Sequence, residues 1–444
     1  MLYVFGVLAF AVGLLASIAL HEIGHMVPAK KFGVKVTQYM VGFGPTVWSR
    51  KRGDTEFGLK AIPLGGYIRM IGMVPPRRDG GRSRWPTRMA TAVEEFRAVS
   101  RAEVAPGDEP RQFYRLTPGK KIVVMLGGPT MNLIIYLILT IVLLSTLGMK
   151  HNDPTTQVNA VVKCVVPATA RITGDSCPAN ATRAPAYGVL RSGDTITSIN
   201  GAPITAWQDA VGVIEKSAGM PLRIGVTRSG VNQIVSLTPV PNVKYANSSG
   251  TQTKTAGYLG VEVKGNSYYA AVPAGEIPGQ IVDQFAQGLR ALGSYPSKIA
   301  SLFGTVFEGK ERDPAGAIGV VGIGRLGGEI ADSKVLDIQD KAFFLISLLA
   351  GINLLLFFFN LLPLLPLDGG HVAGALVEAV KRGRARLRAR GLARVQGGKY
   401  LERQPIYVDT AQMLPIMYGV ASILIVLTLL VVYADIVKPI TLNG

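Results

Sequence analysis

Two histidines and a glutamate stand together near the start of the chain, in the stretch HEIGH, and these residue types can do chemistry. His21 and His25 are four positions apart, so on a helix both imidazoles project from one face and can hold a single cation. Glu22 lies beside them, where it can act as a base without being a ligand. The chain has only 4 histidines in 444 residues, which makes a chance HExxH rare. The alternative is a pair of helix-end histidines that reach toward lipid headgroups.

A catalytic zinc usually has three protein ligands and one position open to water, so this motif needs a carboxylate or histidine from elsewhere. Asp368, in the stretch NLLPLLPLDGGH, is the candidate. Pro363 and Pro366 break the apolar helix before it, and a broken helix at membrane depth is tolerated only inside protein or beside water. His371 is tempting as a fourth ligand, but four protein ligands would close the site to water. We therefore interpret His371 as a supporting residue.

The elements that position these residues are apolar enough to cross a membrane. Hydrophobic residues make up 48% of the chain and the mean hydropathy is +0.31. Four apolar runs reach the roughly 20 residues that a bilayer core requires. We expect the first run to be a retained span, since it lacks the basic start and clear cleavage site of a signal peptide. The composition predicts an integral membrane protein in contact with the lipid bilayer.

The formal charge of +18 is unevenly distributed, and this predicts the topology. Residues 28–121 hold 19 Lys and Arg against 8 Asp and Glu, and residues 368–411 hold 9 against 4, whereas residues 148–341 hold 18 against 15. Short basic connections stay in the cytoplasm. The first and third connections are therefore expected inside and the long middle segment outside. Topology and anionic lipid account for the positive charge without nucleic acid.

The expected fold is an α-helical polytopic membrane protein with four transmembrane helices and an extracytoplasmic α+β domain between spans two and three. Spans one and three then run parallel, which brings the end of each to the same face. The expected segments are span one over 1–27, a cytoplasmic loop over 28–120, span two over 121–147, an exported region over 148–341, span three over 342–367, a basic cytoplasmic loop over 368–411 and span four over 412–438. In the first loop, residues 56–72 suggest a β hairpin against the membrane.

The exported region contains the pattern YGVLRSGDTITSINGAPI, which resembles a bacterial PDZ domain over about residues 158–240. PDZ domains bind extended peptides at a sheet edge, so a peptide C-terminus is an expected partner, although a domain that merely shields or spaces remains an alternative. Amphipathic helices are expected over about 277–307. Cys164 and Cys177 both fall in this region, and we expect a disulfide between them in an oxidising compartment. Two unpaired thiols are the alternative.

Three motifs together resemble the site-2 protease family of intramembrane zinc metalloproteases. They are HEIGH, the Gly-Pro-x-x-Asn pattern in GGPTMN, and the Asn-x-x-Pro…Leu-Asp-Gly-Gly pattern that ends span three. With a PDZ-like domain between spans two and three, the chain is most similar to the bacterial members that cleave anti-sigma factors. One departure is the second proline, since Pro366 falls one position later than in the Asn-x-x-Pro-x-Pro form that the family often has.

The resemblance implies roles for particular residues. His21, His25 and Asp368 are the implied zinc ligands and Glu22 the catalytic base, with Asn360 and Asn132 near the substrate. The alternatives are that Asn360 satisfies the broken helix and that Asn132 serves helix packing. The implied partners are single-span membrane proteins such as anti-sigma factors, cut after a first protease has acted. The implied location is the bacterial cytoplasmic membrane, with the active site toward the cytoplasm.

The competing class is a non-enzymatic membrane scaffold or a metal transporter, in which the PDZ-like domain recruits partners and the polar residues line a metal path. Glu22 discriminates between the two classes, because a carrier needs ligands but no base beside them. The sequence favours the enzyme.

Overall fold

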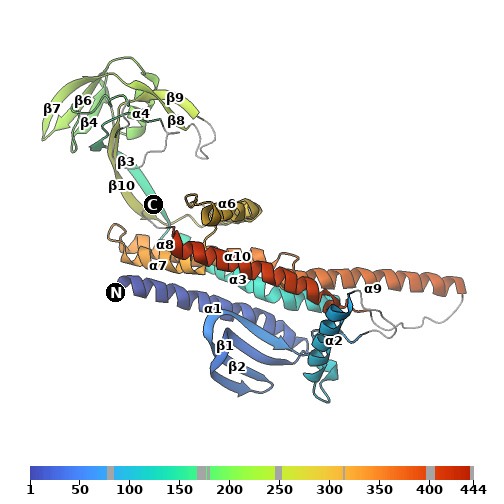
Figure 1. Ribbon diagram of the computed structural model, residues 1–444. Helices are drawn as coiled ribbons and strands as arrows, with labels where there is room; N and C mark the ends of the chain where they lie inside the picture. Colours follow the sequence, from blue (N-terminus) through green and yellow to red (C-terminus); the bar gives the residue numbers. More distant parts are fainter. Residues whose placement is uncertain are drawn as a thin grey trace. The chain divides into compact units, whose positions relative to one another are not determined.

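The computed structural model describes residues 1–77, 85–167, 177, 181–245, 253–313, 316–396 and 406–440 (Figure 1). The chain divides into two compact units. The first, which we call the helical unit, comprises residues 1–147 and 272–444. The second, the PDZ-like unit, comprises residues 148–271. The Arg-rich stretch at 78–84 and part of the second basic connection lie outside the described residues.

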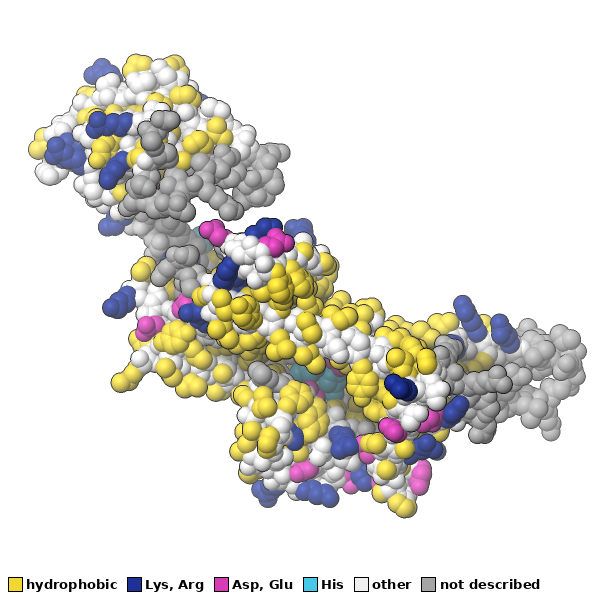
Figure 2. All heavy atoms as spheres, viewed as in Figure 1, with side chains coloured by type: hydrophobic (Ala, Val, Ile, Leu, Met, Phe, Trp, Pro, Cys, Tyr) yellow, Lys and Arg dark blue, Asp and Glu magenta, His cyan; other side chains and the backbone are white. Residues whose placement is uncertain are grey.

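Four helices of the described chain are long and apolar enough to cross a membrane, as the sequence predicts. They are α1 (Leu2–Lys31), α3 (Pro118–Thr146), α8 (Ile338–Asn360) and α10 (Leu414–Val437). Figure 2 shows hydrophobic side chains over much of the face that the long helices form, the surface that a bilayer requires. The third span is shorter than expected: α8 ends at Asn360 instead of continuing to residue 367, because Pro363 and Pro366 cannot continue a helix.

Helix α3 packs between α1 and α8, and small residues let it approach α1 closely. A Cβ atom added to Gly24 would clash with the backbone carbonyl of Gly127, and a Cβ on Gly127 would clash with the carbonyl of Gly24. Backbone-to-backbone contact of this kind is the usual way in which membrane helices gain packing energy, since lipid tails are as apolar as leucine. The two helices are therefore in van der Waals contact at the level of the HEIGH motif.

A small antiparallel sheet lies beside the C-terminal half of α1. It is formed by β1 (Val36–Arg52) and β2 (Thr55–Met70), both bent so that residues 36–41 pair with residues 56–59 on one side and 66–70 on the other. The Tyr39 hydroxyl donates to the carbonyl of Ala19 at 2.8 Å and so ties the sheet to α1. The hairpin expected over 56–72 is thus only part of a larger sheet. The strand at residues 36–41, which pairs with this hairpin, is not predicted, because the pairing is long-range and Gly and Pro follow these residues within β1.

The second basic connection is not a loop at its start. Helix α9 (Asp368–Gln396) begins at the candidate ligand Asp368. The same end of the unit contains α2 (Thr87–Ala102) and the short 3-10 helices η1 (Glu109–Arg111), η2 (Phe113–Arg115) and η3 (Thr410–Met413). Lys121 of α3 donates to both carboxylate oxygens of Glu378 of α9, at 3.1 and 2.9 Å, and both side chains are buried. This charge pair ties α9 to α3. The connection expected over 368–411 thus begins with a helix, because Ala, Leu and Arg favour helical structure once the turn after Pro366 has ended.

The other end of the helical unit contains three further helices. The amphipathic stretch expected over 277–307 lies in α5 (Ile277–Gly293) and α6 (Tyr295–Phe307), and Ile281 and Phe285 of α5 pack against the cluster around Tyr136. Helix α7 (Val320–Asp332) was not expected. The carboxylate of Asp435 accepts hydrogen bonds from the backbone N–H groups at the start of α7 and pairs with Arg312 at 2.6 Å, so these groups hold α7 to α10.

The described part of the PDZ-like unit contains a sheet with strand order β10-β3-β4-β6-β7, a separate β8-β9 pair and the helix α4, in line with the expected α+β domain. The elements are β3 (Met149–Val161), β4 (Thr195–Ile199), β5 (Ala202–Pro203), α4 (Trp207–Lys216), β6 (Leu222–Arg228), β7 (Val231–Leu237), β8 (Val240–Tyr245), β9 (Thr253–Tyr258) and β10 (Val261–Ala270). Leu190, Ile196 and Ile199 of the PDZ-type pattern are in its core. The unit is larger than the expected 158–240, since β3 and β10 extend the sheet.

Two covalent and polar features stabilise this unit. The sulfurs of Cys164 and Cys177 are bonded, with Cα atoms 6.0 Å apart. The buried carboxylate of Asp194, from the PDZ-type pattern, accepts hydrogen bonds from the guanidinium of Arg228 at 2.7 and 2.8 Å and from the backbone N–H of Arg191 at 2.9 Å. The Arg228 hydrogen bond holds the pKa of the Asp194 carboxyl below its usual range.

This ion pair predicts how the PDZ-like unit responds to acid. Because the pKa of Asp194 is lower in the folded than in the unfolded state, the carboxylate stabilises the unit above about pH 4, and this contribution is lost as the pH falls toward the folded-state pKa. We expect Arg228→Met to move acid unfolding of residues 148–271 to higher pH. Hydrogen exchange of the purified chain between pH 7 and pH 2.5 measures this. Arg223→Met, on the exposed face of the same strand, is the control, and equal unfolding pH for both variants would contradict the prediction.

Candidate active site

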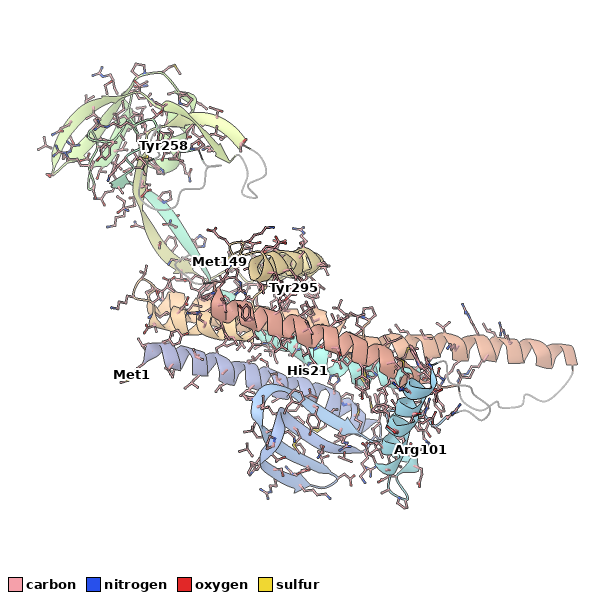
Figure 3. All side chains as sticks on the ribbon, viewed as in Figure 1. Met1, His21, Arg101, Met149, Tyr258 and Tyr295 are labelled. Atoms are coloured by element: carbon pink, nitrogen blue, oxygen red, sulfur yellow. A yellow bond between two sulfur atoms is a disulfide. The ribbon has the colours of Figure 1, made fainter. Side chains whose placement is uncertain are left out.

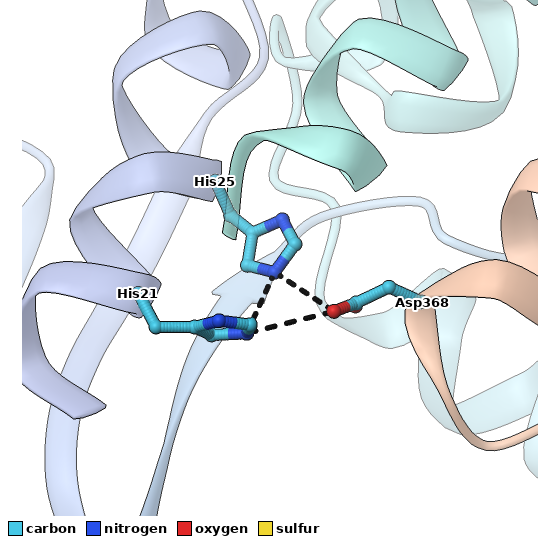
Figure 4. A group of neighbouring side chains, drawn as sticks. All are labelled: His21, His25 and Asp368. Carbon is cyan, nitrogen blue, oxygen red and sulfur yellow. Dashed lines mark hydrogen bonds and ion pairs between the residues drawn. The ribbon is translucent and has the colours of Figure 1, made fainter. Parts of the chain in front are cut away.

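Two histidines four residues apart and an aspartate more than three hundred residues further along the chain converge inside the helical unit (Figure 4), and Figure 3 marks the place of His21 on α1. His21 and His25 come from α1, and Asp368 is the first residue of α9. Their facing atoms form a triangle: His21 Nε2 and His25 Nε2 are 3.2 Å apart, and they lie 3.5 and 3.3 Å from Asp368 Oδ2. The site is largely closed, since His25 is buried and the side chains of His21 and Asp368 are 14% and 19% exposed.

The dimensions of this triangle fit a zinc ion. Zinc binds imidazole nitrogen and carboxylate oxygen at about 2.0–2.2 Å in a tetrahedral arrangement, so neighbouring ligand atoms are about 3.3–3.5 Å apart. The three observed edges, 3.2, 3.5 and 3.3 Å, match this separation. A set of two nitrogens and one carboxylate oxygen leaves a fourth tetrahedral position for water. The residues present therefore fit a catalytic zinc site.

The helix contact described above orients His25. Its Nδ1 lies 2.8 Å from the backbone carbonyl of Val124 in α3. A carbonyl can only accept, and its 2.8 Å contact is much shorter than the 3.4 Å approach of the Gly128 N–H to the same atom. We therefore assign the proton to Nδ1, which leaves the lone pair of Nε2 facing Asp368 and His21. Every residue has a backbone carbonyl, so the sequence alone does not predict which one contacts His25.

Asn132 of α3 contacts His21 in the same way. Its amide lies 3.1 Å from His21 Nδ1, and the residue is only 1% exposed. Between Val124 and Asn132, α3 has Gly128 facing the two imidazoles, where a Cβ atom would clash with His25 Nε2. Glycine at this position leaves the space between the histidine rings open.

The backbone after α8 delivers Asp368. Two short backbone hydrogen bonds, from Leu364 N–H to the Leu362 carbonyl at 2.7 Å and from Leu367 N–H to the Leu364 carbonyl at 2.8 Å, turn the chain before α9 begins. The peptide bond before Pro366 is cis. Gly369 and Gly370 lie so close to the backbone of residues 361–365 that neither has room for a Cβ atom. The shifted position of Pro366 left the backbone between α8 and α9 without a clear prediction, and these contacts define its course.

Glu22 lies beside the triangle of His21, His25 and Asp368, which we call the ligand triangle. It also lies under the edge of the sheet that β1 and β2 form, which we call the hairpin sheet. It is buried, and its carboxylate accepts a hydrogen bond from the backbone N–H of Ile68 in β2. Gly66 of the same strand lies against the Glu22 side chain, since a Cβ there would be 3.1 Å from Glu22 Cγ. The sheet therefore holds the carboxylate beside the candidate metal position and covers it.

The remaining candidate residues lie apart from the triangle. Asn360 is the half-buried last residue of α8, and the structure describes no contact between it and the three ligand atoms. His371 is not among the group that could hold a metal. It lines a small cavity of 30 Å³ together with Lys121 and Glu378. The two cysteines lie in the PDZ-like unit and contribute nothing to this site.

An HExxH helix that faces a carboxylate among membrane-length helices is the arrangement of a membrane-embedded zinc metallohydrolase. The family model described as "Peptidase family M50" matches residues 9–397. The chain therefore belongs to Peptidase family M50, the family of the site-2 proteases, as its motifs predict. It is an intramembrane zinc metalloprotease with four candidate membrane spans, and the scaffold and transporter alternatives fall away.

Curated zinc metalloproteases match all or most of the chain. The chain is 33% identical over 453 residues to the zinc metalloprotease Rip1 of Mycobacterium tuberculosis, with 100% of each chain covered. It is 25% identical over 425 residues to the zinc metalloprotease RasP of Geobacillus kaustophilus, covering 84% of this chain and 90% of that protein. Among solved structures, the PDZ domain of an SdrC-like protein from Listeria monocytogenes matches 24% of this chain and 87% of its own, at 18% identity and a TM-score of 0.15. The PDZ-like character of residues 148–271 follows from their own sheet and from the motif in their core.

Substitution of Gly128, which has no side chain, allows a direct test of the site. Because a Cβ atom there would clash with the His25 ring, we expect Gly128→Ala to displace the imidazole and to lower zinc affinity and cleavage at least tenfold. Gly351→Ala is the matched control, since this glycine of α8 has open space where its Cβ would lie. Zinc content after dialysis and cleavage of a membrane substrate measure the effect. Equal zinc content in the two variants would show that the rings tolerate the methyl group.

Proposed function

We propose that this protein cleaves transmembrane segments of single-span membrane proteins, anti-sigma factors among them, in regulated intramembrane proteolysis. In this proposal His21, His25 and Asp368 hold the zinc ion and Glu22 is the catalytic base. The observation that carries it is the ligand triangle of zinc dimensions with a buried carboxylate beside it. Family membership supports the reaction class, and the substrate class is our inference from the membrane setting of the site.

The chemistry needs few groups. A zinc ion bound here supplies Lewis acidity and lowers the pKa of a water from about 15.7 toward 7. Glu22 then accepts the proton from the water that attacks the peptide carbonyl, and it returns that proton to the leaving amine. The Ile68 N–H keeps the Glu22 carboxylate in place. Asn360, at the end of α8, is proposed to contact the substrate backbone near the scissile bond.

The proposed orientation places the site at the cytoplasmic side and the PDZ-like unit outside. It is supported by the basic residues that follow α1 and precede α3, since short basic connections stay in the cytoplasm. Lys30 and Lys31 end α1 only five or six residues after His25, so the candidate metal position lies near that end of the span. Cleavage in this position would release a fragment toward the cytoplasm, in the bacterial cytoplasmic membrane.

A groove along α1 supports a helical membrane segment as substrate. It has a volume of 650 Å³ and is lined mainly by apolar residues of α1, α7 and α10, with Pro63 of β2 at one side. Phe10 and Leu14, which line it, lie on the helix that leads directly to His21. A single apolar segment seated there would run toward the candidate metal position.

The PDZ-like unit is proposed to bind a peptide C-terminus, such as the end that a first protease leaves on the exported side of a substrate. Strand β10 supports this, because it lies at the edge of the sheet and its outer side is available for strand addition. In this role the unit would select substrates that have already been trimmed.

The hairpin sheet is proposed to hold the substrate after local unwinding. A helical substrate engages its scissile carbonyl in its own hydrogen bonds, so it must become extended before it is cut. Residues 66–70 form an edge of the sheet directly above Glu22, and an extended segment can pair with such an edge.

Helix-breaking residues in the substrate should therefore favour cleavage. We expect a single-span substrate whose Gly and Pro residues near the scissile bond are changed to Leu to be cut at least tenfold more slowly than the parent. The rate of fragment release by the purified enzyme measures this, and equal rates would contradict a requirement for unwinding.

Glu22→Gln is the central test of the proposed function. The amide cannot take a proton from water, so we expect cleavage to fall by at least a hundredfold while zinc binding is retained. Glu95→Gln, on the exposed side of α2, is the control and should cleave normally. Both are co-expressed with single-span proteins and the fragments are analysed by mass spectrometry. Persisting cleavage by Glu22→Gln would overturn the catalytic role, and a scissile bond at the exported end of the substrate span would overturn the proposed orientation.

A further inference from the structure

Helix α3 supplies a partner for the rear nitrogen of each histidine in the ligand triangle. The carbonyl of Val124 lies 2.8 Å from His25 Nδ1, and the Asn132 amide lies 3.1 Å from His21 Nδ1. The two partners are eight residues apart on one helix, on either side of Gly128. The Val124 contact is buried, and the Asn132 contact is part-buried, with Asn132 itself 1% exposed.

The tautomer of His21 follows from the direction of its ring. Its Nε2 faces His25 Nε2 and Asp368 Oδ2, at 3.2 and 3.5 Å (Figure 4). A neutral imidazole that ligates a metal through Nε2 must carry its proton on Nδ1. The partner of His21 Nδ1 must then be a hydrogen-bond acceptor, as the Val124 carbonyl is for His25.

The amide of Asn132 can provide that acceptor. As placed, its Nδ2 faces His21 Nδ1 and its Oδ1 is buried without a hydrogen-bond partner among the described atoms. Oxygen and nitrogen of an amide have nearly the same shape, and a half-turn about the last bond exchanges them. The exchange brings Oδ1 onto the Nδ1–H of His21. The unturned amide would instead favour the proton on Nε2, and a ring in that tautomer cannot bind a metal through Nε2.

We propose that Asn132 is a positioning residue for the metal site, with its Oδ1 accepting the Nδ1–H of His21 and so holding Nε2 free for zinc. This inference rests on the proposed ligand role of His21. It gives Asn132 a role in metal binding, in place of the substrate contact that the family resemblance implies. A residue that is 1% exposed and whose amide faces a histidine ring has no surface left for a substrate backbone.

A second buried asparagine provides the control. Asn353 of α8 is fully buried, also has an Oδ1 without a described partner, and donates to Ser17 Oγ at 3.0 Å and to the Leu349 carbonyl at 2.8 Å. It makes no described contact with the three candidate ligands. Replacing either asparagine by leucine removes a buried interhelical amide of the same kind, but only one replacement removes the partner of His21.

The experiment compares Asn132→Leu, Asn132→Asp and Asn353→Leu in the purified full-length chain. Zinc affinity is measured by competition with a chromogenic chelator, and the thermal stability of the metal-free protein is measured in parallel. We expect Asn132→Leu to bind zinc 10- to 100-fold more weakly, the usual effect of losing a partner of a ligating histidine. Asn132→Asp keeps an acceptor and should bind zinc within threefold of wild type or more tightly. Asn353→Leu should bind zinc within about twofold of wild type even where it lowers the melting temperature.

The outcomes separate this inference from the proposed function. Zinc affinity of folded Asn132→Leu equal to that of Asn353→Leu would overturn the positioning role. If Asn132→Leu does not fold, Asn132→Asp decides, since a tenfold loss of zinc affinity in that variant would also overturn it. His21→Leu is measured beside them. Unchanged zinc affinity in His21→Leu would show that the proposed ligand set itself is wrong, whatever Asn132 does.

Discussion

The close approach of α1 and α3 is the constraint on which the rest of the site depends. Gly24 and Gly127 allow the two backbones to touch, and no larger residue fits at either position. This contact places the Val124 carbonyl and the Asn132 amide behind the two histidines and leaves Gly128 as a gap in front of them. A wider separation of the helices would leave both imidazoles free to rotate and their Nδ1 groups unpaired in a region without water, which is costly.

The third ligand is subject to a second constraint of the same kind. Asp368 reaches the histidines because the chain turns back between α8 and α9, and Gly369 and Gly370 pack against the turn that precedes them. The buried pair of Lys121 and Glu378 then ties α9 to α3. Helix α3 is thus in contact with the helices that carry all three ligands, while the hairpin sheet covers Glu22 from the remaining side. The candidate catalytic residues are therefore held by helices and a sheet, as a preorganised site requires.

Much of this arrangement could be predicted from patterns, and the exceptions have physical causes. The four spans, the HExxH histidines and the Asp368 candidate follow from local composition and spacing, which depend on one segment at a time. The partner strand at residues 36–41 was missed because its pairing is long-range and its own residues include no clear alternation. Helix α9 was missed because a run of arginines suggests a solvated loop, although arginine is a good helix former. Helix α7 was missed because its glycines disfavour a helix, while the buried Asp435 carboxylate that receives its first N–H groups comes from more than a hundred residues away.

The sequence by itself determined which residue types are available for chemistry: two histidines one helical turn apart, a glutamate beside them and an aspartate after a broken span. It also determined the membrane setting, because hydropathy is a sum over neighbouring residues. Only the tertiary structure decided that the three candidate ligand atoms lie 3.2–3.5 Å apart, that a backbone carbonyl contacts His25, and that Asn132 faces His21. Backbone groups are the same in every residue, and the direction of a side chain depends on which helices touch. These features therefore leave no trace in the order of the amino acids until the chain has packed.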